Sequence, residues 1–90
     1  MTVEELVHSF YQVLLLYERS VDPHYEVVED DYLGYLDRLS VLMCGAGNMK
    51  AYLALRGLYN MGNNAEHRTV KSISFWLIEL AKKGEIVYGV

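Results

Sequence analysis

Apolar residues recur every three or four positions in four stretches of the chain, the spacing that places side chains on one face of an α-helix. The first stretch begins at Thr2, where Thr2 and Glu5 have the spacing of a capping box. We expect this helix to run to about Ser20, because Pro23 removes a backbone donor and displaces the residue before it from helical geometry. Its predicted face consists of Val3, Leu6, Val7, Phe10, Val13, Leu14 and Tyr17, and Tyr11, Leu15 and Leu16 widen that face.

Two further helices are predicted in the middle of the chain. Asp30 and Asp31 can cap the second helix, which we expect to end at Gly45. Asn48 can cap the third helix, which we expect to end at Gly62 because glycine tolerates the backbone geometry that closes a helix. The predicted faces are Tyr32, Tyr35, Leu36, Leu39, Leu42 and Met43 in the second helix, and Met49, Tyr52, Leu53, Leu55, Leu58 and Tyr59 in the third.

A fourth helix is predicted in the last third of the chain. Asn63 and Glu66 again have capping spacing, and Gly84 is expected to end the helix. The predicted face is Val70, Ile73, Leu77, Leu80 and Ala81, while Phe75, Trp76 and Ile78 make the helix apolar nearly all round. Residues 85–90 are of types that favour strands, so the pattern leaves open a short C-terminal strand.

These elements predict an all-α fold, a compact four-helix bundle. The chain has 90 residues, which suits one hydrophobic core, so we expect residues 1–90 to form a single helical domain. Short links between helices favour antiparallel neighbours. The first and fourth helices carry more apolar residues than one buried face needs, which predicts a homodimer or an interface with a partner.

Charge is divided unevenly along the chain. Residues 1–45 carry nine acids and two bases, a net charge of −7, whereas residues 46–90 carry three acids and six bases, a net charge of +3. Such a division indicates two faces with different roles, or two copies that dock acidic face to basic face. We therefore predict a protein partner with a basic surface. The predicted interaction residues are Glu26, Glu29, Asp30, Asp31, Tyr32, Tyr35 and Asp37.

Catalytic and cofactor chemistry is not indicated by the sequence. The glycines of residues 45–50 lack the spacing of a phosphate-binding loop, and His8, His24 and His67 are far apart, without metal-ligand spacing. Cys44 lies among apolar residues, so we expect it to be buried. We predict no enzyme, no cofactor and no metal. No apolar run approaches the roughly 20 residues of a membrane span, and the acidic start is unlike a secretion signal, so we expect no membrane contact and a cytoplasmic protein.

One segment resembles a known family. Residues 72–88, with Ile73, Leu77, Leu80, Gly84 and Ile86, are similar to the recognition helix and following strand of winged helix-turn-helix DNA-binding domains. The resemblance implies that Arg68, Lys71, Ser72 and Ser74 lie near DNA and that Lys82 and Lys83 contact phosphates.

Two functional hypotheses follow. The first is a non-catalytic protein that acts by binding a macromolecule, as protein antagonists, immunity proteins and adaptors do. The alternative is a DNA-binding transcriptional regulator of the helix-turn-helix type.

Overall fold

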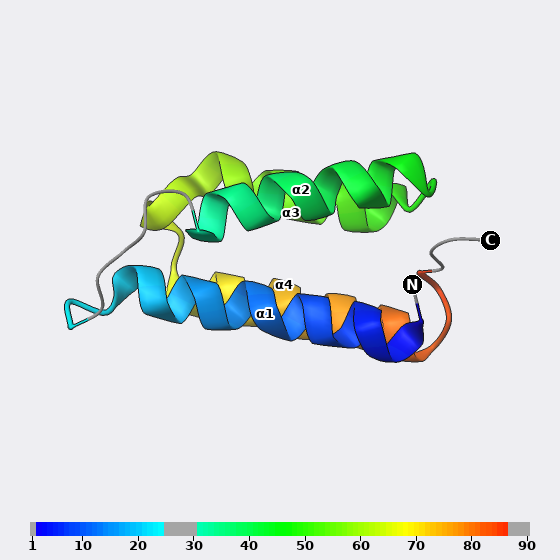
Figure 1. The fold of residues 1–90 in the computed structure, drawn as a ribbon, viewed down its shortest axis with the longest axis horizontal. Helices are drawn as coiled ribbons and strands as arrows, with labels where there is room; N and C mark the ends of the chain where they lie inside the picture. The colour runs from blue at the N-terminus through cyan, green and yellow to red at the C-terminus, as the bar shows by residue number, and fades with distance from the viewer. Residues whose placement is uncertain (1, 25–30, 87–90) are drawn as a thin grey trace.

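The computed structural model describes residues 2–24 and 31–86, which form four α-helices (Figure 1). These are α1 (Val3–Val21), α2 (Asp31–Gly45), α3 (Met49–Met61) and α4 (His67–Lys82), with a short 3-10 helix, η1 (Gly62–Asn64), before α4. The prediction of an all-α, four-helix fold is confirmed. Glu85 and Ile86 are not in a strand, and the rest of the tail lies outside the described residues.

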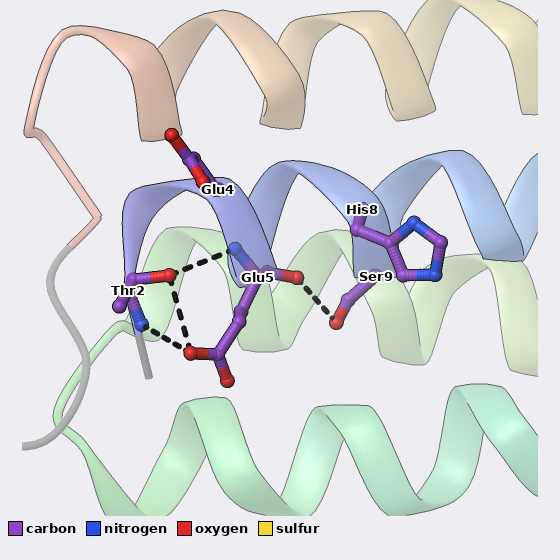
Figure 2. Close-up of a pocket in the computed structure, with 5 residues that line it drawn as sticks. All are labelled: Thr2, Glu4, Glu5, His8 and Ser9. Atoms are coloured by element: carbon purple, nitrogen blue, oxygen red, sulfur yellow. Dashed lines mark hydrogen bonds between the residues drawn. The ribbon is translucent and has the colours of Figure 1, made fainter.

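The predicted capping box at the start of α1 is present. The Thr2 hydroxyl accepts a 3.1 Å hydrogen bond from the Glu5 backbone N–H, and the Glu5 carboxylate accepts one of 3.4 Å from the Thr2 N–H (Figure 2). These two bonds satisfy donors that have no partner within the helix.

The cap predicted for the fourth helix is wrong. Asn63 lies within η1, and the residue that precedes α4 is Glu66, whose side chain makes no capping hydrogen bond. The physical reason is the turn at Gly62, whose φ of 62° closes α3 and starts η1 at once. The chain therefore completes a 3-10 turn before α4 begins.

The helices are arranged as two pairs, α1 against α4 and α2 against α3, and Figure 1 shows these pairs as two layers. Tyr17, near the end of α1, contacts His67, the first residue of α4, with ring centroids 5.6 Å apart. Tyr11, which is nearer the start of α1, contacts Phe75, which is farther along α4. The two helices therefore run antiparallel, and the molecule is elongated, about 40 Å by 20 Å by 19 Å.

One cluster of buried side chains joins all four helices. Phe10, Leu36, Leu55 and Leu77 are among its fully buried members, one from each helix, and Ile86 packs on it after the end of α4. Four positions of the predicted apolar faces are instead exposed: Val3, Leu42, Met49 and Leu53. In α3 the buried line is Ala51, Leu55 and Leu58, which turns the side chains of Met49 and Leu53 to the opposite side.

Candidate interaction surface

Two acids of the predicted protein-binding site, Asp31 and Asp37, are among the described residues, and they do not lie together. Asp31 and Asp37 are both exposed on α2, but their spacing of six residues places them on different sides of the helix. The Asp37 carboxylate accepts a 2.7 Å hydrogen bond from the Arg56 guanidinium of α3, so its charge is partly balanced within the chain. Three further predicted residues lie outside the described residues: Glu26, Glu29 and Asp30.

Tyr32, which was predicted to be an interaction residue, does not lie on the surface. Its side chain is 2% exposed, and its ring centroid lies 5.3 Å from that of Tyr17. Burial raises the pKa of Tyr32 to about 12, with a smaller contribution from Tyr17. The neighbouring acids suggested exposure, but the helical period places Tyr32 on the same buried line as Leu36. Tyr35 is half-buried against the edge of the core.

Most residues of the predicted DNA-binding set are exposed on or just after α4. The exposed members are Arg68, Lys71, Ser72, Lys82 and Lys83. The prediction that Ser74 lies near DNA is wrong, because Ser74 belongs to the buried face of α4 with Val70 and Leu77. After α4, Gly84 adopts a φ of 74° and Ile86 is buried in the core.

The outer side of α1 and α4 carries a set of residues that we call the α1/α4 face. On each helix the positions follow one another at spacings of three and four residues, so they lie along one side of that helix. The set is Glu4, His8, Tyr11, Leu15 and Glu18 on α1, and Arg68, Lys71, Phe75, Glu79 and Lys82 on α4. All ten residues are exposed.

Large apolar side chains occupy the centre of this face. The rings of Tyr11 and Phe75 meet edge to face, with centroids 6.1 Å apart and planes 83° apart, an arrangement that aromatic pairs favour. Tyr11 is 44% exposed and Phe75 is 45% exposed. Leu15, one turn beyond Tyr11 on α1, is also exposed. The pair thus joins the two helices while much of both rings remains accessible.

Two open hollows flank Tyr11 along α1. One is lined by Val3, Glu4, Val7, His8, Tyr11 and Lys82, and the other by His8, Tyr11, Gln12, Leu14, Leu15 and Glu18. A third hollow at the helix start is lined by Thr2, Glu4, Glu5, His8 and Ser9 (Figure 2). Figure 2 shows the Glu4 side chain pointing toward α4, whereas that of Glu5 points away from α4 and serves the cap. The surface is therefore continuous from Glu4 to Glu18.

The ends of the α1/α4 face are charged, with opposite signs on the two helices. At one end, Glu18 Oε1 lies 3.7 Å from His67 Nε2, and Arg68 follows His67 on α4. At the other end, Glu4 and Lys82 border the same hollow. An apolar centre with a charged rim is the usual composition of a protein interface.

Other chemistry is not assembled within the described residues. They contain no group of three or more His, Cys, Asp or Glu side chains that could hold a metal ion. The expectation that Cys44 is buried is wrong: the buried line of α2 passes through Leu39 and Met43, and Cys44, one position further, is exposed. Among the described helices, none is long and apolar enough to cross a membrane.

Comparison with known proteins gives no relative. No protein-family model, curated protein or solved structure matches this chain.

Surplus apolar surface was predicted on the first and fourth helices, and the exposed Tyr11, Leu15 and Phe75 agree with that prediction. These three residues were not predicted to form a site. The sequence could have indicated them, because Tyr11, Leu15 and Phe75 lie outside the buried sides of their helices. Those buried sides include Phe10 on α1 and Leu77 on α4. Pairing the two exposed rings, however, requires knowing that α1 packs on α4.

Proposed function

We propose that this protein is a non-catalytic module that acts by binding another protein through the α1/α4 face. The observation that carries the proposal is the Tyr11–Phe75 pair, two aromatic rings in contact that each remain close to half exposed. Aromatic side chains are enriched at the centres of protein interfaces, where a few of them supply most of the binding free energy.

The hydrophobic effect favours covering this centre. Burying apolar surface contributes roughly 25 cal/mol per Å², and Tyr11, Leu15 and Phe75 all have apolar surface left to bury. The Tyr11–Phe75 contact holds the two rings in position before binding, so a partner loses less free energy in ordering them. The face is therefore suited to a protein surface with apolar residues at its centre.

The acidic first half of the chain is assigned a supporting role in this proposal. Exposed acids such as Glu4, Glu18 and Asp31 attract a partner with a basic surface and increase the association rate, more than they add to affinity. A module of this kind suits an antagonist, immunity or adaptor protein, each of which acts by occupying a partner.

The proposal is tested by photo-crosslinking from the face in an extract of the cells that produce the protein. Phe75 is replaced by p-benzoylphenylalanine, and the matched control carries the same residue in place of Leu53, which is exposed on α3. We expect a protein adduct from position 75 and little or none from position 53. No adduct from position 75, or equal adducts from both positions, contradicts the proposal.

DNA binding is the second candidate function, and the exposed bases of α4 favour it. Arg68, Lys71 and Lys82 lie on one side of the helix and could contact phosphates. Glu79 on the same side, and Glu18 beside the start of α4, weaken the attraction of this surface to DNA. The test is fluorescence anisotropy of a mixed-sequence duplex at low and physiological salt. Binding that weakens steeply with salt and is lost in Arg68→Glu supports this function, and no binding at low salt removes it.

A further inference from the structure

We infer that the protein partner of the α1/α4 face is a second copy of this chain, related by a two-fold axis that runs parallel to α1 and α4. The inference rests on the proposed function, since it names the occupant of the same surface. In this dimer, α1 of each copy lies on α4 of the other, and the Tyr11–Phe75 pairs of both copies meet at the centre.

The first observation is the order of side chains along each helix. On α1 the exposed line has an acid at each end, Glu4 and Glu18, with His8, Tyr11 and Leu15 between them. On α4 it has a base at each end, Arg68 and Lys82, with Lys71, Phe75 and Glu79 between them. The acidic ends of one line therefore complement the basic ends of the other, and each line carries an aromatic ring at its centre.

The second observation is that, inside one copy, corresponding residues of the two lines lie at the same height along the helix axes. Tyr11 contacts Phe75, Glu18 contacts the His67 that precedes Arg68, and Glu4 borders a hollow with Lys82. Because α1 and α4 run antiparallel, each acidic end of the α1 line lies beside a basic end of the α4 line.

The symmetry of the dimer follows from these heights along the helix axes. A two-fold axis parallel to the helices exchanges the places of α1 and α4 but leaves the height of every residue along the axis unchanged. It places Glu18 of one copy opposite Arg68 of the other and Glu4 opposite Lys82. Of the remaining residues of the α4 line, Glu79 is then opposite His8 and Lys71 is opposite Leu15.

The other simple face-to-face dimer is disfavoured by charge. A two-fold axis that lies in the plane of the interface but perpendicular to the helices would place α1 on α1. Glu4 of one copy would then lie opposite Glu18 of the other. It would likewise place Arg68 opposite Lys82. Like charges at both ends of an interface oppose association, so the charge pattern selects the axis parallel to the helices.

The test uses two charge reversals, Glu18→Lys and Arg68→Glu, studied by sedimentation equilibrium. Each variant alone places like charges opposite each other twice per dimer, and we expect the dimer to weaken about tenfold or more. Mixed together, the two variants restore opposite charges at both contacts of the heterodimer, so the mixture should associate as the wild type does. The matched control is Arg38→Glu, the same charge change at an exposed position of α2.

Neither reversal should unfold the chain. Glu18 lies in the last turn of α1 and Arg68 in the first turn of α4, so each reversal introduces the sign of charge that the helix dipole favours. The Glu18–His67 contact that is lost is exposed and contributes little to stability. Circular dichroism of each variant confirms helicity alongside the mass measurement.

Each other outcome overturns the inference. A monomeric wild type removes the dimer, and variants that dimerise as the wild type does place the interface elsewhere. A dimer strengthened by Glu18→Lys indicates the α1-on-α1 arrangement, and two monomeric variants that stay monomeric when mixed contradict the pairing of Glu18 with Arg68. A monomeric wild type whose position 75 still crosslinks to a different protein overturns this inference and leaves the proposed function standing.

Discussion

The hydroxyl of Tyr17 in α1 donates a 2.6 Å hydrogen bond to the backbone carbonyl oxygen of Ala65, which directly follows η1. Both residues are buried, and 48 positions separate them in the chain. The bond satisfies a carbonyl that would otherwise be buried without a partner in the bend before α4. It therefore fixes the start of α4 against α1. The α1/α4 face requires this, because its residues on α1 and α4 must lie side by side.

Replacing Tyr17 by phenylalanine should destabilise the fold by about 1 to 3 kcal/mol, because the Ala65 carbonyl loses its partner while remaining buried. Urea unfolding followed by circular dichroism measures the change. The matched control is Tyr59→Phe, which keeps the ring that lies 4.4 Å from the Arg56 guanidinium carbon and should change stability little. Equal unfolding midpoints for the two variants would contradict the role given to Tyr17.

Tyr32 should make the stability of the protein depend on pH in the alkaline range. Its pKa is about 12 in the folded chain and about 10 when unfolded, so the folded state holds the proton more tightly. The stabilisation is complete below pH 10 and is lost as pH rises toward 12, at about 1 kcal/mol per pH unit.

The comparison that isolates this effect is Tyr32→Phe, because the other tyrosines titrate in the same range. The buried Tyr32 hydroxyl has no hydrogen-bond partner among the described residues, so the variant should be as stable as the wild type at pH 7. Between pH 10 and 12 the wild type should lose stability faster than the variant. If the two curves of stability against pH are parallel, burial does not shift the pKa of Tyr32.

The contrast between Tyr17 and Tyr32 illustrates what the sequence can predict. The spacing of apolar residues and the glycines at helix ends predicted four helices correctly, because both are local properties of the sequence. The prediction that Tyr32 is an interaction residue was wrong, because neighbouring acids are a weaker signal than the position of a residue on the buried side of its helix. The tertiary partners of both rings depend on how the helices pair, which no local pattern encodes.

Two leucines two positions apart on α3 should differ sharply in their contribution to stability. Leu55→Ala removes a fully buried side chain and should cost about 2 to 5 kcal/mol through lost burial and the cavity left behind. Leu53→Ala, at a position that is 64% exposed, should cost less than about 0.5 kcal/mol. Thermal unfolding of both variants checks the orientation of α3, and similar losses would contradict it.

The capping box at the start of α1 should be measurable by itself. Thr2→Ala removes the oxygen that accepts from the Glu5 N–H and should cost about 1 kcal/mol. Thr2→Ser retains that oxygen and should be nearly neutral. Chemical denaturation of the two variants provides the comparison, and a neutral alanine variant would show that the box adds nothing to the stability of the fold.

The contact between Tyr11 and Phe75 in the α1/α4 face could likewise not be predicted from local sequence patterns. Surplus apolar residues predicted an interface on the first and fourth helices, and the charge division predicted that acids around the second helix bind a basic partner. Of that set, Tyr32 is buried and Asp37 is bonded to Arg56. The exposed rings of Tyr11 and Phe75 become a candidate site once the antiparallel packing of α1 and α4 brings them together.

The most direct test of the proposed dimer is the mass of the wild-type chain in solution, measured by sedimentation equilibrium beside Phe75→Ser and Leu53→Ser. A face that binds a second copy predicts a wild-type mass that rises with concentration from 10.3 kDa toward twice that value. Phe75→Ser should remain at the monomer mass, and Leu53→Ser should behave as the wild type does. A wild type that stays at 10.3 kDa up to about 1 mM would contradict the dimer, as would an unchanged Phe75→Ser variant.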